Sequence, residues 1–281
     1  MTAGLDWDYS GLASAYGRRP AYAAAVLESC WRGGDIRRGM RAADVGAGTG
    51  HLTVPLLRRG LRVTAIEPND DMRRAGIART RAERRACWVT AVAEALPLAA
   101  GAFDLVTFGS SFNVVDQARA LDESARVLKP GGWLVCVWNH RDLDDPLQAR
   151  IEALIRDAIP DYRYGARRTD QGTILASSPA FPRVRALEAR FVATMPSGDV
   201  VEAWRSHVTL RRQAGARLPR ILEGIRELVA TAAPRTIAVP YTTRVWMAQR
   251  SPACTWSRAP EPRGPAPGQR AGVSPQRAHA D

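Results

Sequence analysis

The feature that most constrains the fold of this chain is an alternation of short apolar segments with helix-like segments over residues 21–139. The apolar segments have the length of β-strands and cover residues 41–47, 62–68, 86–93, 102–111 and 133–139. Helix-like patterns lie before and between them, at residues 21–31, 51–60, 70–80 and 118–128. Apolar strands that alternate with helices are typical of a parallel sheet covered on both faces. The sequence therefore predicts an α/β fold.

After residue 139 the pattern becomes less regular. Helix-like patterns return at residues 146–159, 200–215 and 218–233, and strand-like patterns at 183–195 and 235–250. Residues 139–182 otherwise form an irregular segment, and the sequence KPGG at residues 129–132 predicts a turn. We expect one domain over residues 1–250. Residues 251–281 hold six prolines and few aliphatic side chains, which predicts a disordered tail.

The composition indicates in which compartment the protein works and which kinds of metal or disulfide site it can contain. Hydrophobic residues make up 46% of the chain, which predicts a packed globule. The longest apolar runs are strand-sized, so we expect no membrane span, and no secretory signal is recognisable at the N-terminus. The four cysteines form no CxxC pair, which predicts neither a metal site nor a disulfide framework. Reduced thiols are typical of a cytoplasmic protein.

The net charge of +12 raises the question of a nucleic-acid partner. Only one of the 40 basic residues, Lys129, is a lysine, and the arginines are dispersed along the chain without interleaved aromatic residues. A solvated basic surface is the simpler interpretation. Nucleic acid is therefore not an expected partner, and the oligomeric state stays open.

Three glycines, Gly46, Gly48 and Gly50, follow the first strand in the sequence ADVGAGTGHLT and precede a helix. This arrangement is typical of a turn that brings its backbone close to a nucleotide-like ligand. A P-loop is excluded because the turn contains no lysine. The dinucleotide pattern GxGxxG is disfavoured, because the position of its last glycine is occupied by His51.

The remaining pattern, D-x-G-x-G-x-G from Asp44 to Gly50, resembles that of class I S-adenosylmethionine-dependent methyltransferases. The segments AVAEALPLAAGAFDLVTFGSS and LDESARVLKPGGWLVCVW also resemble segments of this family. The N-terminal Tyr16, Arg19 and Pro20 resemble the lid of its ubiquinone-biosynthetic and trans-aconitate-type members. The resemblance implies a Rossmann-like, mostly parallel seven-stranded sheet, with helices on both faces and a small substrate-cap insertion at residues 139–182.

The same resemblance implies S-adenosyl-L-methionine as cofactor. The glycine turn is expected beneath its methionine and ribose, Glu67 at the ribose hydroxyls, and the pair after the third strand near adenine. The cofactor-binding residues expected on this basis are Tyr16, Arg19, Asp44, Gly46, Ala47, Gly48, Gly50, Glu67, Pro68, Met72, Ala93, Glu94 and Ser110. Some of them have a second interpretation: the three glycines as a tight turn only, Glu67 as the cap of the following helix, and Glu94 as a solvent-facing residue.

The acceptor is expected to be a small molecule. The fourth strand is not followed by the N/D-PPY tetrad, which disfavours methylation of DNA adenine and protein glutamine. We expect the acceptor pocket near Ser110–Asn113, Asn139–Arg141, the irregular segment and the sequence AWRSH. His140 and His207 are candidate general bases, with His140 favoured because it follows a central strand. Aromatic residues suit a planar acceptor and arginines an acidic one; the candidates are Tyr162, Tyr164, Trp204, Arg167, Arg168 and Arg205.

Two alternatives remain at this point. One is an RNA methyltransferase, suggested by the charge. The other is a protein that keeps the cofactor-binding fold without methylating. Methylation of a small molecule, as one step of a specialised biosynthesis, is the principal expectation.

Overall fold

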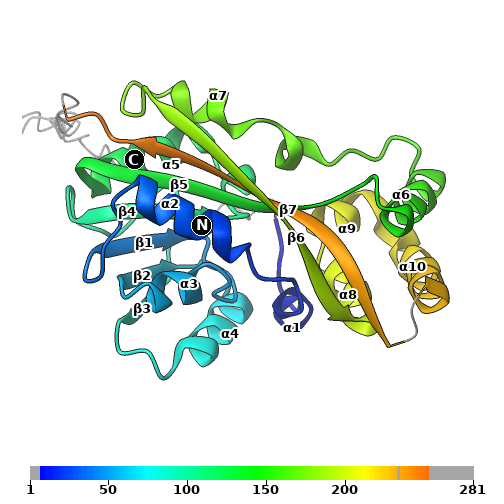
Figure 1. The fold of residues 1–281 in the computed structure, drawn as a ribbon. Coiled ribbons are helices and arrows are strands. Elements are labelled where there is room, and N and C mark those ends of the chain that lie inside the picture. The colour runs from blue at the N-terminus through cyan, green and yellow to red at the C-terminus, as the bar shows by residue number, and fades with distance from the viewer. Residues whose placement is uncertain (1–6, 233–234, 253–281) are drawn as a thin grey trace, which may run out of the picture.

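The computed structural model describes residues 7–232 and 235–252, and its centre is one seven-stranded sheet in the order β3-β2-β1-β4-β5-β7-β6 (Figure 1). The strands are β1 (Arg41–Val45), β2 (Arg62–Ile66), β3 (Ala86–Val89), β4 (Phe103–Gly109), β5 (Leu128–Arg141), β6 (Val184–Pro196) and β7 (Thr236–Gln249). β1 to β5 pair in parallel, and β7 is antiparallel to both β5 and β6. The predicted mostly parallel, Rossmann-like sheet is thereby confirmed.

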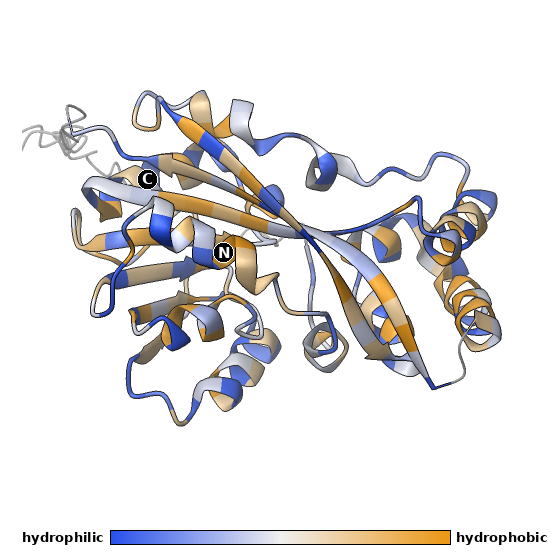
Figure 2. Ribbon diagram, viewed as in Figure 1, coloured by the Kyte–Doolittle hydropathy of each residue, from blue (hydrophilic) through white to orange (hydrophobic). Residues whose placement is uncertain are grey.

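Helices cover both faces of this sheet. α2 (Ala24–Gly33) and α3 (Thr53–Arg58) share one apolar core with the strands, and α5 (Gln117–Val127) and α7 (Gln171–Ala176) share another. α4 (Asp70–Thr80) packs at the β3 edge, where Gly76 leaves room for the Trp88 ring. Hydrophobic residues follow the central strands in Figure 2. The two covered faces explain why these strands are apolar throughout.

A second group of helices packs against the far halves of β6 and β7. It comprises α6 (Pro146–Ala158), α8 (Ser197–Arg205), α9 (Val208–Ala214) and α10 (Leu218–Ala232), with an apolar core of its own. In Figure 1 these helices lie at the opposite end of the long strands from α2 and α3, and α1 (Ala13–Gly17) lies between the two groups. The structure thus places more of the chain in this region than the expected insertion at residues 139–182.

The predicted helix at residues 200–215 is two helices. α8 ends before Ser206, and His207 adopts an extended conformation at the N-cap of α9, where its side chain accepts a hydrogen bond from the Leu210 amide. A side chain that accepts a hydrogen bond from a nearby backbone amide in this way offers the chain an alternative to a continuous helix, as Ser, Thr, Asn and Asp do at N-caps. The single-helix prediction was therefore wrong at this position.

The sequence KPGG does not form a free turn. Residues 129–132 lie within β5 and bulge out of the ladder, so that Phe103 pairs with Leu128 and Leu105 with Trp133. β5 also continues through Arg141, so Asn139 to Arg141 belong to a strand and not to a loop. A bulge bends a strand without ending its pairing, which is why a turn signal appears inside a strand here.

Short 3-10 turns complete the fold at η1 (Phe112–Val114), η2 (Gly165–Arg168) and η3 (Gly215–Arg217). Within residues 7–232 and 235–252, none of the helices combines the length and the apolar character needed to cross a bilayer. The predicted tail at residues 253–281 lies outside the described part of the chain and stays a prediction.

Candidate functional site

The turn between β1 and α3 owes its glycines to its backbone geometry. Gly46, Gly48 and Gly50 have φ angles of +65°, +57° and +84°, a region that residues with a Cβ enter at a cost. At Gly46 space is limiting too, because a Cβ there would lie 2.5 Å from the Cβ of Ser111. The turn therefore lies directly against the segment that follows β4.

Asp44, at the end of β1, supports this turn from inside the protein. It is fully buried, and its carboxylate accepts hydrogen bonds from the hydroxyls of Thr53 (2.6 Å) and Thr107 (2.8 Å). Burial raises the pKa of Asp44 to about 6, although the two hydroxyl bonds act in the opposite direction. Asp44 thus connects β1, α3 and β4 and does not line the pocket described below.

Glu67 follows β2 and is held by two backbone amides. Its Oε2 accepts a hydrogen bond from Gly48 N and its Oε1 from Asn69 N, both at 2.8 Å. The side chain is 7% exposed, and burial raises its pKa. The cap of α4 is Asn69, whose side chain accepts from Met72 N at 3.1 Å. The helix-cap interpretation of Glu67 is therefore wrong.

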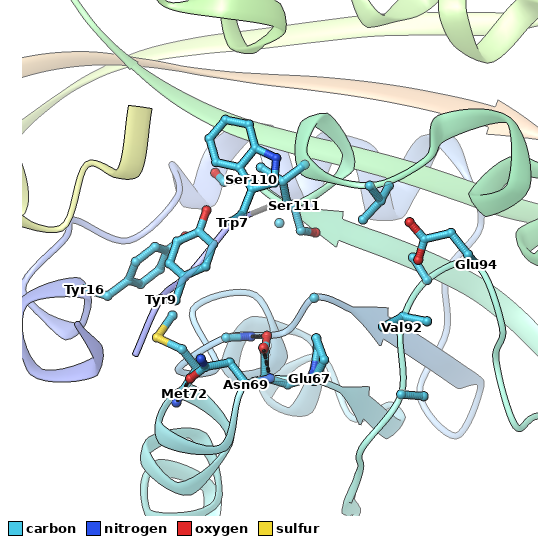
Figure 3. A pocket seen from close by; sticks show the side chains of 18 residues that line it. Trp7, Tyr9, Tyr16, Glu67, Asn69, Met72, Val92, Glu94, Ser110 and Ser111 are labelled. Atoms are coloured by element: carbon cyan, nitrogen blue, oxygen red, sulfur yellow. Dashed lines mark hydrogen bonds between the residues drawn. The ribbon is translucent and has the colours of Figure 1, made fainter. Parts of the chain in front are cut away.

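These elements surround the first pocket, which we call the glycine-turn pocket (Figure 3). Its space, part of which is open to solvent, amounts to about 740 Å³. Nine of the expected cofactor residues line it: Tyr16, Gly46, Gly48, Glu67, Pro68, Met72, Ala93, Glu94 and Ser110. The structure therefore brings together residues that lie far apart in the sequence, as the resemblance implied.

The pocket also has walls that the sequence analysis missed. They are formed by Trp7, Tyr9, Asn69, Ala91, Val92, Gly109, Ser111, Val114 and Val115. Figure 3 shows Trp7, Tyr9 and Tyr16 on one side and Val92 and Glu94 on the opposite side, with Glu67 between them. The cap signal at Asn69 was present in the sequence, but Trp7 and Tyr9 carried no signal of their own.

Four expected cofactor residues do not line this pocket. Ala47 and Gly50 shape the turn through backbone bonds, Ala47 N to Ile66 O and Gly50 N to Ala47 O. Asp44 is buried behind the turn, and Arg19 lines a different pocket. Their contribution to the first pocket is therefore indirect, because they fix the chain that forms it.

A second pocket adjoins the first one, and we call it the arginine pocket. Its space, part of which is open to solvent, amounts to about 470 Å³. It is lined by Tyr16, Arg19, Pro20, Tyr22, His51, Ser110, Asn139, Arg141, His207 and Tyr241. Tyr16 and Ser110 line both pockets. The Tyr22 and Ser110 hydroxyls are hydrogen-bonded over 3.2 Å, and burial raises the pKa of Tyr22. A molecule in one pocket would therefore lie next to a molecule in the other.

The two candidate bases are placed differently. His207 lines the arginine pocket, whereas His140 lines neither pocket. Successive side chains of a strand point to opposite faces, so His140 points away from the face that carries Asn139 and Arg141. The two pockets therefore give no support for preferring His140, and a role of either histidine as the base stays a prediction.

The hydrogen bonds of His207 and His51 define how each ring can act. His207 Nδ1 accepts from Leu210 N at 3.3 Å, so a neutral ring carries its proton on Nε2. His51 Nε2 lies 3.1 Å from the carbonyl oxygen of Arg19, which requires a proton on Nε2 and leaves Nδ1 to accept from Thr49 at 3.0 Å. Burial lowers the pKa of His51 to about 4, with Arg79 contributing. Neither ring has its Nδ1 lone pair available for an acceptor's proton.

Most other residues expected around the acceptor use their side chains for contacts within the protein. Asn139 Nδ2 donates to the carbonyls of Pro20 and Ala21, and thereby fastens the N-terminal segment. Ser111 donates to Val45 O, and Asn113 accepts from the Trp138 indole. The remaining candidates are buried, hydrogen-bonded or ion-paired in the structure, namely Phe112, Tyr162, Tyr164, Arg168, Trp204 and Arg205. The Arg167 side chain lies outside the described part.

Known proteins resemble this chain in sequence. Residues 43–136 match the family described as "Methyltransferase domain". An uncharacterised methyltransferase of Mycobacterium tuberculosis is 39% identical over 142 residues, 49% of this chain and 54% of that protein. A demethylmenaquinone methyltransferase of Staphylococcus aureus is 39% identical over 36% of this chain and 44% of its own length. The chain thus spans about half the length of the curated relatives it matches.

Solved structures show the same fold. A protein of Anaeromyxobacter dehalogenans assigned as a type II methyltransferase superimposes with a TM-score of 0.63 at 23% identity, over 83% of this chain and 99% of that one. A protein of Anabaena variabilis, assigned to an antibiotic biosynthesis pathway as a methyltransferase, gives a TM-score of 0.56 at 19% identity, over 82% and 98%. At these identities the likeness concerns the fold alone.

Proposed function

We propose that this protein transfers a methyl group from S-adenosylmethionine to a small organic molecule, since residues 43–136 match the family described as "Methyltransferase domain". The observation that carries the proposal is the placement of Glu67. Its carboxylate is fixed by Gly48 N and Asn69 N in the wall of the glycine-turn pocket. Each carboxylate oxygen keeps a lone pair with which it can accept from a ribose hydroxyl.

The other walls of the glycine-turn pocket also suit this cofactor. Ala91, Val92 and Ala93 provide an apolar surface on which an adenine ring can pack, with Val114 and Val115 nearby. Tyr16 and the turn at Gly46 and Gly48 lie next to the arginine pocket and suit the methionine portion. Bound S-adenosylmethionine supplies a methyl group on a positively charged sulfur, which departs as a neutral thioether.

The N-terminal segment would close over the reactants. Gly11 N donates to Asp71 Oδ2 at 2.9 Å, and Asn69 Nδ2 donates to Ser10 Oγ at 3.2 Å. Further along, Arg19 donates to both the side chain and the carbonyl of Ser206. The segment is thus fastened to α4 and to the end of α8. Its function in this proposal is to exclude water and align the acceptor with the methyl group.

The geometry favours a small acceptor over RNA. The arginine pocket is lined by Tyr16, Arg19 and Tyr22 of the N-terminal segment and by His207 at the start of α9. Its space of about 470 Å³, part of it open to solvent, suits a molecule of limited size. The relative from Staphylococcus aureus is named for methylation of demethylmenaquinone, a small molecule, which supports the same proposal.

The proposal is tested in two steps. S-adenosylhomocysteine and S-adenosylmethionine are titrated into the protein by calorimetry, and both should bind at one site. The protein is then incubated with methyl-labelled S-adenosylmethionine and either total RNA or a bacterial metabolite extract. Label in the extract supports the proposal, label in RNA favours the RNA alternative, and binding without transfer favours a non-methylating protein.

A further inference from the structure

Arg141, at the end of β5, is a half-buried cation without an anionic partner. Its guanidinium carbon lies 4.0 Å from the ring centre of Trp204 and 5.8 Å from that of Tyr241. Within residues 7–232 and 235–252, no atom accepts a hydrogen bond from the Arg141 side chain. Its Nε–H group is buried and has no hydrogen-bond acceptor there. Removing a charged donor from water is costly unless a partner compensates, and ring faces compensate only in part.

Arg19 brings a second positive charge to the same pocket. Its Nε and Nη2 donate to Ser206 Oγ at 2.8 Å and Ser206 O at 2.7 Å, and its guanidinium carbon lies 4.0 Å from the Tyr16 ring centre. No carboxylate in the described part of the chain forms an ion pair with Arg19, and none of the residues that line the arginine pocket is acidic. The pocket is therefore positively charged.

Three acceptor atoms of the side chains that line this pocket are already engaged. Asn139 Oδ1 accepts from the Thr243 hydroxyl at 2.6 Å. The Nδ1 atoms of His51 and His207 accept from Thr49 and Leu210, as described above. What the pocket offers a ligand is therefore mainly hydrogen-bond donors, which favours a ligand rich in acceptor atoms.

We propose that the arginine pocket binds an ionised carboxylate of the methyl acceptor, with Arg141 as its principal partner. A guanidinium stacked on an aromatic ring presents its N–H groups edge-on, and this edge matches a planar carboxylate with two parallel bonds. Arg19 has already committed donors to Ser206, so one carboxylate fits the pocket better than a doubly charged phosphate. The rings of Tyr16, Tyr22 and Tyr241 suit a planar body on that acid.

This inference rests on the proposed function, and its test uses defined probes. Benzoate, cinnamate and their neutral analogue benzamide are titrated into the protein saturated with S-adenosylhomocysteine. The carboxylates should bind and benzamide should not bind measurably. Arg141→Gln should weaken carboxylate binding roughly ten- to a hundredfold, and Arg141→Lys should restore part of it. Arg150→Gln, an exposed position on α6, makes the same charge change and should have no effect.

The outcomes separate the two proposals. Retained S-adenosylhomocysteine binding by Arg141→Gln, together with an unchanged melting temperature, shows that a loss of carboxylate binding is local. If both carboxylates fail to bind, or bind Arg141→Gln as well as the parent protein, the carboxylate site is overturned while the cofactor assignment stands. Tighter binding of phenyl phosphate than of benzoate also overturns it. If S-adenosylhomocysteine itself does not bind, the proposed function fails.

Discussion

The backbone amide of Gly48 donates a hydrogen bond to Glu67 Oε2 over 2.8 Å and so connects the turn after β1 to the residue after β2. The two residues are 19 positions apart in the sequence and lie side by side because β1 and β2 are adjacent parallel strands. The carboxyl ends of such strands meet at one edge of the sheet, which is where ligands of this fold class bind.

Replacing Glu67 should weaken cofactor binding without removing the fold. A carboxylate that accepts bonds from ribose hydroxyls contributes about 1.5–3 kcal/mol, so Glu67→Ala should weaken S-adenosylhomocysteine binding roughly ten- to a hundredfold. Glu28→Ala, on the exposed side of α2, is the control and should bind as the parent protein does. Calorimetry measures both. Unchanged affinity in folded Glu67→Ala, or tight binding of NAD by the parent protein, would contradict the assignment.

Two alanine substitutions, one in the glycine turn and one at a control position, can separate the cost of backbone strain from the cost of steric crowding. Gly46 and Gly101 have similar φ angles, +65° and +62°, but only at Gly46 does an added Cβ meet a neighbour, 2.5 Å from Ser111 Cβ. Gly101→Ala should lower the free energy of unfolding by about 1–2 kcal/mol through strain. Gly46→Ala should lower the free energy of unfolding by about 1–3 kcal/mol more than Gly101→Ala does. Urea unfolding measures both, and equal losses would show that the contact with Ser111 relaxes freely.

The buried carboxyl of Asp44 should make stability fall as the pH rises. Burial raises its pKa from 3.8 to about 6, so between these values the folded protein holds a proton that the unfolded chain has lost. The free energy of unfolding then decreases with rising pH, by up to roughly 3 kcal/mol for a shift of this size. Full stabilisation from this group is present below about pH 4 and is lost as the pH passes 6.

The contribution of Asp44 can be isolated with Asp44→Asn. The free energies of unfolding of the parent protein and of this variant are compared between pH 4 and 7. The free energy of unfolding of the parent protein should decrease steadily relative to that of Asp44→Asn as the pH rises. Asp122→Asn, an exposed position on α5, should give a constant difference. A constant difference for Asp44→Asn as well would show that its pKa is not raised.

The histidines should differ in what their removal changes. His207→Ala removes the cap of α9 and should cost about 0.5–2 kcal/mol of stability, together with a higher Michaelis constant for the acceptor. His140→Ala should leave methyl transfer unchanged, because this side chain lines neither pocket. Transfer from labelled S-adenosylmethionine to the active extract is the measurement. A fall in turnover of about 10²–10⁴ for His140→Ala, with cofactor affinity intact, would restore it as a candidate base.

The sequence alone determined the framework of the glycine-turn pocket. Apolar strands that alternate with helices can bury both faces only in a covered parallel sheet, which is how residues 41–139 fold. Glycines at Gly46, Gly48 and Gly50 are required by local backbone geometry, so they are visible without tertiary information. The position of Glu67 beside the glycine turn was predictable because the carboxyl ends of adjacent parallel strands lie at the same edge of the sheet.

The tertiary structure decided which side chains share the arginine pocket. The face to which His140 points depends on how far β5 continues, and the bulge at residues 129–132 shows that local turn signals do not define that strand. Three separate segments carry Arg19, Arg141 and Trp204. These segments meet only when the second group of helices, α6, α8, α9 and α10, packs against β6 and β7. Such contacts depend on long-range packing and leave no periodic pattern in the sequence, because no single segment contains the interaction.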